Sequence, residues 1–176
     1  MEKKYKFTEE TIDVNGRTLC RIEALRDFGD VKKGDKGGFI EKEDNLSQSY
    51  GCWVYGDAVV CDDAIVSDNA VVFGNATVYG NVKIYDNAKV CDKAVVFGNA
   101  VICDNVRVFG DARIYDNVKV YGDAIVCGDA VVSVNAEVCD KAIVCGEAIV
   151  SDNAVVCGNA IVSEYAEVCG NMKICN

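Results

Sequence analysis

A six-residue repeat runs through the chain from Cys52 to Asn171 without an insertion. Its first hexads read CWVYGD, AVVCDD, AIVSDN and AVVFGN, and twenty hexads follow one another before the partial repeat MKICN. The first residue is Ala in most hexads, the third is always Val or Ile, and the second varies. Such alternation is typical of a short strand with one buried face. Most hexads end with Gly or Asp at the fifth position and Asn or Asp at the sixth, and these residues favour a turn.

This repeat resembles that of the hexapeptide-repeat, left-handed parallel β-helix proteins, in which three hexads form one coil. The resemblance implies an all-β fold, a left-handed parallel β-helix of about seven coils with strand layers about 4.8 Å apart. The left hand is what the resemblance implies, because strand periodicity alone does not distinguish the two hands. Such a solenoid is stable only as a stack, since one coil buries too little surface.

The phase of the repeat predicts which side chains lie inside the coils. The third residue of each hexad points inward, and Ala at the first position fits the narrow corner where the walls converge. One corner carries Asn in successive coils, and we expect left-handed turns and a hydrogen-bonded side-chain ladder there. Its members are Asn81, Asn99, Asn117, Asn135, Asn153 and Asn171.

The first 45 residues follow a different pattern. Asn15-Gly16 between two alternating runs predicts a β-hairpin. ALRDFGDV, the turn at residues 34–38 and the later CWVY resemble the N-terminal module that precedes hexapeptide coils in bacterial and phage-borne proteins, several of them named as transferases. We therefore expect a capping module over residues 1–45 and a β-helix over residues 46–176. The cap would cover the open backbone edge of the first coil.

The best-known hexapeptide proteins are acyltransferases, which use a histidine base, and carbonic anhydrases, which hold a metal with three histidines. Histidine suits such work because its unperturbed pKa is near 6.5. This chain has no histidine, and no loop interrupts its hexads. We therefore predict a non-catalytic protein that needs no cofactor or metal. A transferase with a carboxylate base is left as a minor alternative.

The 11 cysteines are interpreted as reduced, small residues of the walls in a cytoplasmic protein. Stacked cysteines 18 residues apart have nearly parallel Cβ vectors, which fit a disulfide poorly, and a linear ladder supplies only two of zinc's four ligands. The charged N-terminus MEKKYKFTEE and the lack of a long apolar run argue against export and membrane insertion. A net charge of −10 argues against a nucleic-acid partner.

The second residue of each hexad faces outward, yet it is Val or Ile in many coils. Ile125, Ile143 and Ile161 lie 18 residues apart and therefore in one column. An apolar wall of this size is unusual on a monomer, and the family resemblance implies a trimer. We predict a homotrimer that buries such walls.

The middle coils break the apolar pattern with cations at the second position and aromatic residues at the fourth. A belt of this kind suits a small anionic, ring-bearing ligand such as a nucleotide. The alternative is that these cations pair with turn aspartates on a solvated wall. We predict ligand binding or sequestration at subunit seams, as the resemblance to phage-borne modules also implies, with a self-assembling scaffold as the alternative. The candidate ligand-binding residues are Lys83, Tyr85, Lys89, Arg107, Phe109, Arg113, Tyr115, Lys119 and Tyr121.

Overall fold

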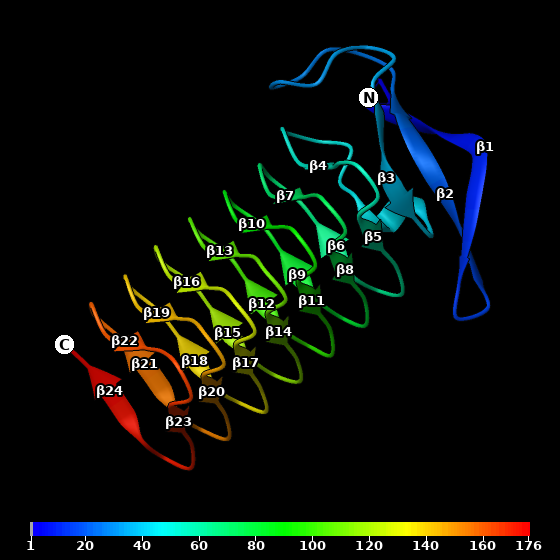
Figure 1. Cartoon of the computed structure of the whole chain (residues 1–176). Helices are drawn as coiled ribbons and strands as arrows, with labels where there is room; N and C mark the ends of the chain where they lie inside the picture. The colour runs from blue at the N-terminus through cyan, green and yellow to red at the C-terminus, as the bar shows by residue number, and fades with distance from the viewer. Residues whose placement is uncertain (1) are drawn as a thin grey trace.

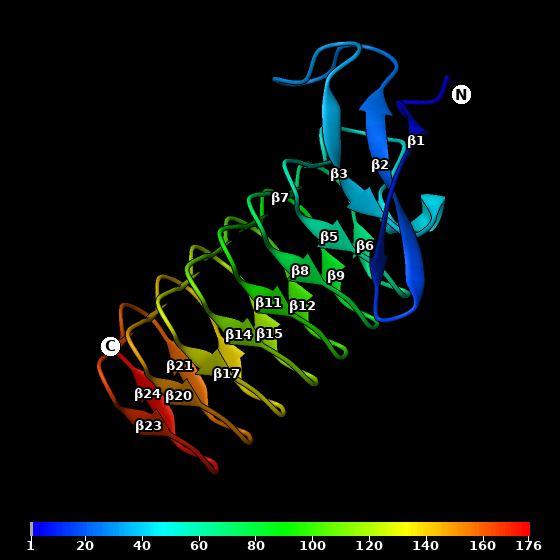
Figure 2. The same ribbon diagram turned by 45° about the vertical axis from the view of Figure 1, so that its right-hand side comes forward.

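The computed structural model describes residues 2–176 and is built almost entirely from strands. Stacked coils form a straight solenoid, and an N-terminal hairpin lies at one end of the stack (Figures 1 and 2). The predicted all-β fold with a hairpin at its N-terminal end is therefore confirmed. Among residues 2–176, no helix has the length and hydropathy to cross a membrane.

The solenoid has three walls, each a sheet of parallel strands. Wall 1 consists of β4 (Trp53–Val54), β7 (Val71–Val72), β10 (Lys89–Val90), β13 (Arg107–Val108), β16 (Ile125–Val126), β19 (Ile143–Val144) and β22 (Ile161–Val162). Wall 2 consists of β3 (Lys36–Ile40), β5 (Val59–Val60), β8 (Thr77–Val78), β11 (Val95–Val96), β14 (Arg113–Ile114), β17 (Val131–Val132), β20 (Ile149–Val150) and β23 (Glu167–Val168). Wall 3 consists of β6 (Ile65–Val66), β9 (Lys83–Ile84), β12 (Val101–Ile102), β15 (Lys119–Val120), β18 (Glu137–Val138), β21 (Val155–Cys157) and β24 (Lys173–Cys175).

Each hexad strand before the last coil pairs in register with the residues 18 positions further along the chain. Val95 lies opposite Arg113, and Val96 lies opposite Ile114. This register places equivalent hexad positions in columns, so the core is a stack of Ala at the corners and Val or Ile on the walls. Nearly all of these side chains are fully buried, and Val82, Val106 and Val118 occupy the corner position in the middle coils.

The turns hold successive coils together through hydrogen bonds along the axis. The predicted Asn ladder is confirmed: each amide from Asn81 to Asn153 donates to the next Asn at 2.9–3.3 Å. The left-handed residue, however, is the one before each Asn, such as Gly98 (φ 79°) or Asp116 (φ 63°). A Cβ on Gly98 would lie 2.6 Å from the backbone nitrogen of Asp116, so a larger residue at this turn would force the two coils to shift.

The N-terminal module joins the solenoid directly. β1 (Tyr5–Val14) and β2 (Arg17–Ala24) form the predicted hairpin, with Asn15 and Gly16 both at positive φ. β2 pairs with β3, which pairs in parallel with β5, and the 3-10 helix η1 (Glu43–Asn45) follows β3. Wall 2 therefore continues into the module before residue 46.

The module also covers side chains of the first coil that the repeat places outside. The expectation that Trp53 and Val59 face solvent is wrong, because both are buried. Trp53 makes edge-on ring contacts with Tyr5 and Phe28 of the module. The buried Lys4 ammonium donates to the Cys52 carbonyl at 2.9 Å and fixes the start of the chain against this coil.

Candidate functional site

Wall 1 carries two adjoining surface depressions, which we call the wall 1 groove. The first has a volume of about 420 Å³, the second has a volume of about 330 Å³, and both are lined by Phe73 and Lys89. Columns of the second and fourth hexad positions supply most of the lining, and Asp30 of the N-terminal module borders the first depression. The complete lining is Asp30, Tyr55, Val71, Phe73, Lys89, Cys91, Asp92, Arg107 and Phe109.

Two cations lie side by side in the second depression of the groove. Lys89 and Arg107 are directly opposite each other in the β10–β13 pair, and both side chains are exposed. Like charges on neighbouring strands repel each other. All nine ion pairs of residues 2–176 fall between residues 3 and 63, so no carboxylate lies within 4.0 Å of either cation. A bound anion would relieve this repulsion.

Aromatic rings flank the two cations along the fourth hexad position. Phe73 lies one coil before Cys91, and Phe109 lies one coil after it, so the two rings border the second depression on either side of Cys91. Both rings are half-buried and leave surface for an apolar or aromatic group. The groove therefore combines positive charge with ring surface, which suits an anion that carries a ring.

Cys91 is the only thiol that lines the groove within the described chain. Burial and the neighbouring Asp92 raise the pKa of this thiol to about 11, although Arg107 and Lys89 act in the opposite direction. The thiol is therefore protonated near neutral pH and is a poor nucleophile. The Asp92 carboxylate accepts a hydrogen bond from the Gly110 amide at 3.1 Å, so it serves the turn.

The predicted ligand-binding residues are divided among the three walls. Lys89, Arg107 and Phe109 come together in the wall 1 groove. Arg113 and Tyr115 lie on wall 2, where they border a separate depression with the stacked rings of Tyr79 and Phe97. Lys83, Tyr85, Lys119 and Tyr121 lie on wall 3.

The wall 3 residues are engaged differently from those of the groove. The Tyr121 hydroxyl donates to Glu137, and this hydrogen bond raises the pKa of the phenol. Lys119 lies in register with Glu137, an opposite charge, whereas Lys83 lies between Ile65 and Val101. The wall 1 pair is therefore the place in this belt where two cations are direct neighbours.

Sequence reasoning did not include six of the groove residues among the ligand-binding candidates, and one of them, Asp92, resembled the other turn aspartates of the repeat. Tyr55, Phe73 and Cys91 share the 18-residue column of Phe109, and that spacing could have identified them. Val71 could have been found in the same way, because it lies in the column of Lys89. Asp30 carries no such signal, because the N-terminal module lies outside the repeat.

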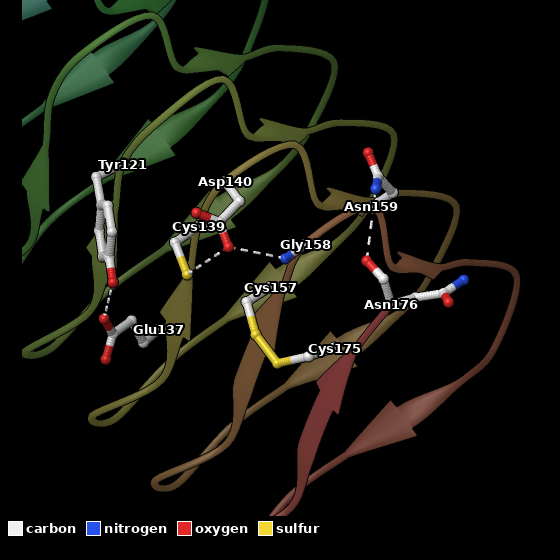
Figure 3. Close-up of a disulfide and its surroundings, with 9 residues drawn as sticks. All are labelled: Tyr121, Glu137, Cys139, Asp140, Cys157, Gly158, Asn159, Cys175 and Asn176. Atoms are coloured by element: carbon white, nitrogen blue, oxygen red, sulfur yellow. Dashed lines mark hydrogen bonds between the residues drawn. A yellow bond between two sulfur atoms is a disulfide. The ribbon is translucent and has the colours of Figure 1, made fainter.

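One cysteine pair differs from the sequence interpretation. Cys157 and Cys175 form a disulfide, so the expectation that all cysteines are reduced is wrong for this pair. The β21–β24 register places the two residues opposite each other with Cα atoms 4.6 Å apart, within the disulfide range. Figure 3 shows the two sulfur atoms bridging the gap between these coils. The remaining nine cysteines carry free thiols.

Comparison with known proteins supports the architecture. The family model described as the YdcK beta solenoid repeat matches residues 112–128, the segment that contains β14, β15 and β16. The chain is a β-solenoid repeat protein. No curated protein matches it. The matched segment contains Arg113 and Lys119 but lies outside the central cation pair of the wall 1 groove.

Proposed function

We propose that this β-solenoid is a non-catalytic binding protein that holds a small anionic, ring-bearing ligand of the nucleotide type in the wall 1 groove. The observation that carries the proposal is the neighbouring pair Lys89 and Arg107, which has no carboxylate partner within 4.0 Å among residues 2–176. In this arrangement the guanidinium and the ammonium bind phosphate, and the Phe73 or Phe109 ring packs against the base.

The proposal assigns binding rather than turnover to the groove. Its thiol, Cys91, is protonated near neutral pH, and its aspartate, Asp92, is engaged in a turn hydrogen bond. The chain has no histidine to serve as a base. A protein of this kind would lower the free concentration of its ligand by sequestration.

We further propose that the chain is related to the hexapeptide-repeat, left-handed β-helix proteins and assembles as a homotrimer. The unbroken hexads support the relationship. Ile125, Ile143 and Ile161 lie in register on wall 1, beyond Arg107 in the same column, and Ile161 is 64% exposed. Burial of this column against a second copy would extend the groove into a seam and exclude water from its apolar half.

Isothermal titration with ADP, which carries both a ring and phosphates, tests the proposal. We expect Lys89→Glu to abolish the binding heat, because it reverses one member of the cation pair. Lys119→Glu is the matched control, since it removes an exposed lysine of the same hexad position on wall 3. Equal loss of binding in both variants would indicate a diffuse charge effect and would contradict a site in the groove. If neither ADP nor other nucleoside phosphates bind, the ligand class is wrong and the scaffold alternative gains support.

A further inference from the structure

A column of three cysteines runs along wall 3 at its C-terminal end. Cys139, Cys157 and Cys175 occupy the fourth position of hexads 18 residues apart, and Asp140 follows the first of them (Figure 3). The Cys139 sulfur, the Cys157 sulfur and a carboxylate oxygen of Asp140 all lie within 4.8 Å of one another. Three potential metal ligands from two neighbouring coils therefore point to one place.

The number of donors and the spacing of the coils limit which metal ion the stacked thiolates can hold. With metal–sulfur bonds of about 2.3 Å, two sulfurs are about 3.8 Å apart in a tetrahedron and about 4.6 Å apart in a linear arrangement. Strand layers are about 4.8 Å apart, and the Cα atoms of Cys157 and Cys175 are 4.6 Å apart. The Cys157 and Cys175 sulfurs meet across this same spacing, so rotation of the side chains can shorten the gap. The donor set of two thiolates and one carboxylate is nevertheless smaller than the four ligands of tetrahedral zinc, and it suits a soft ion of low coordination number.

The surroundings of the column are fixed by the solenoid. Cys139 is buried, and one Asp140 oxygen accepts a hydrogen bond from the Gly158 amide at 2.9 Å. The same carboxylate lies 4.0 Å from the Cys139 sulfur. The backbone thus holds a negative charge beside the two sulfur atoms, which favours a cation at this position.

We propose that the reduced cysteine column binds a thiophilic monovalent cation, Cu(I), between the sulfur atoms of Cys139 and Cys157, with Asp140 beside it. Thiolate ligands select soft ions such as Cu(I). Binding replaces two S–H protons by one Cu(I), so two protons are released to solvent and no electron is transferred. The Cys157–Cys175 disulfide removes one of the two ligands, so the oxidised chain lacks this site.

A second stacked pair must be separated from this column in any test. Cys127 and Cys145 lie 18 residues apart in one column of wall 1, directly after two strands that pair in register. The Cys127→Ser variant breaks that pair and leaves the wall 3 column intact. Cys91 provides a matched control, because its column neighbours 18 residues away are Phe73 and Phe109 rather than thiols.

The experiment is an anaerobic titration of the reduced Cys127→Ser protein with Cu(I) in competition with a chromogenic Cu(I) chelator. We expect one tightly bound equivalent. It should be lost when Cys157→Ser is added, retained when Cys91→Ser is added, and lost when the Cys157–Cys175 disulfide is intact. Alkylation followed by peptide mass spectrometry should show Cu(I)-dependent protection of Cys139 and Cys157, a readout that also works in the unmutated chain if a variant does not fold.

Two results would overturn the proposal. One is a reduced protein that does not retain Cu(I) against the chelator, or retains it equally well with Cys157→Ser. The other is a column that takes up Zn(II) under the same conditions and rejects Cu(I), since this would show that the column completes a four-ligand site rather than a two-thiolate site.

Discussion

Val134 occupies a backbone conformation that its side chain disfavours. It stands at the fifth position of its hexad with φ 66°, where neighbouring coils have Asp116 and Asp152. A left-handed conformation costs an ordinary residue about 1–2 kcal/mol, and a β-branched side chain raises this cost. Asn adopts the left-handed conformation more readily. Asn would also place an acceptor where the turn aspartates accept an amide from the next coil, as Asp152 does from Gly170 at 2.9 Å.

We therefore expect Val134→Asn to stabilise the protein by about 1 kcal/mol, which corresponds to a rise in Tm of about 2–4 °C for a chain of this size. Thermal unfolding followed by far-UV circular dichroism measures this change. Val134→Thr is the matched control, because it keeps the β-branch and the shape of the side chain and should bring no gain. Equal stability of the Asn and Thr variants would refute the assignment of strain to this turn.

Two further predictions concern the core and its thiols. Ala112→Leu should destabilise the chain by about 1–3 kcal/mol because the buried corner has no room for the larger side chain. Ala112→Val should cost less stability, since Val118 occupies an equivalent corner position. Chemical denaturation measures the free energy of unfolding of both variants, and equal losses would contradict this dependence on side-chain size. Burial raises the pKa of the Cys61 thiol to about 11 from an ordinary value of 9.0, so the folded chain retains this proton to higher pH than the unfolded chain. The resulting stabilisation is complete below about pH 9 and is lost as the pH rises to about 11. The difference in unfolding free energy between the natural chain and Cys61→Ala should therefore shrink between these pH values. A difference that stays constant with pH would contradict the effect of burial on this thiol.

Much of the solenoid could be predicted because the repeat has two independent periods. Alternation within each hexad gives the buried face of a strand, and the 18-residue coil places the Asn81 column at one corner. Both periods can be read directly from the sequence, and the strands of the three walls pair in the register that they predict from Cys52 onward. The left hand of the coil, which the family resemblance implied, stays a prediction, because alternation is the same in either hand.

The errors concern side-chain contacts that the repeat pattern does not determine. Trp53 has the hexad position of an exposed residue, but the N-terminal module covers it, and no periodicity reports that contact. The Cys157–Cys175 bridge depends on how two side chains turn within one column, which spacing alone does not determine. In the candidate site, the cation pair was visible as consecutive members of one column, whereas Asp30 enters the groove from a non-repetitive loop.

The most direct test of the proposed function is native mass spectrometry of the protein purified from cells, with denaturing release of any bound molecule. The account predicts a trimer that carries an anionic, nucleotide-sized ligand, and it predicts loss of that ligand in a Lys89→Glu and Arg107→Glu double variant that still assembles. A trimer that is empty both as purified and after incubation with nucleotides, or a ligand that the double variant retains, would contradict binding in the wall 1 groove.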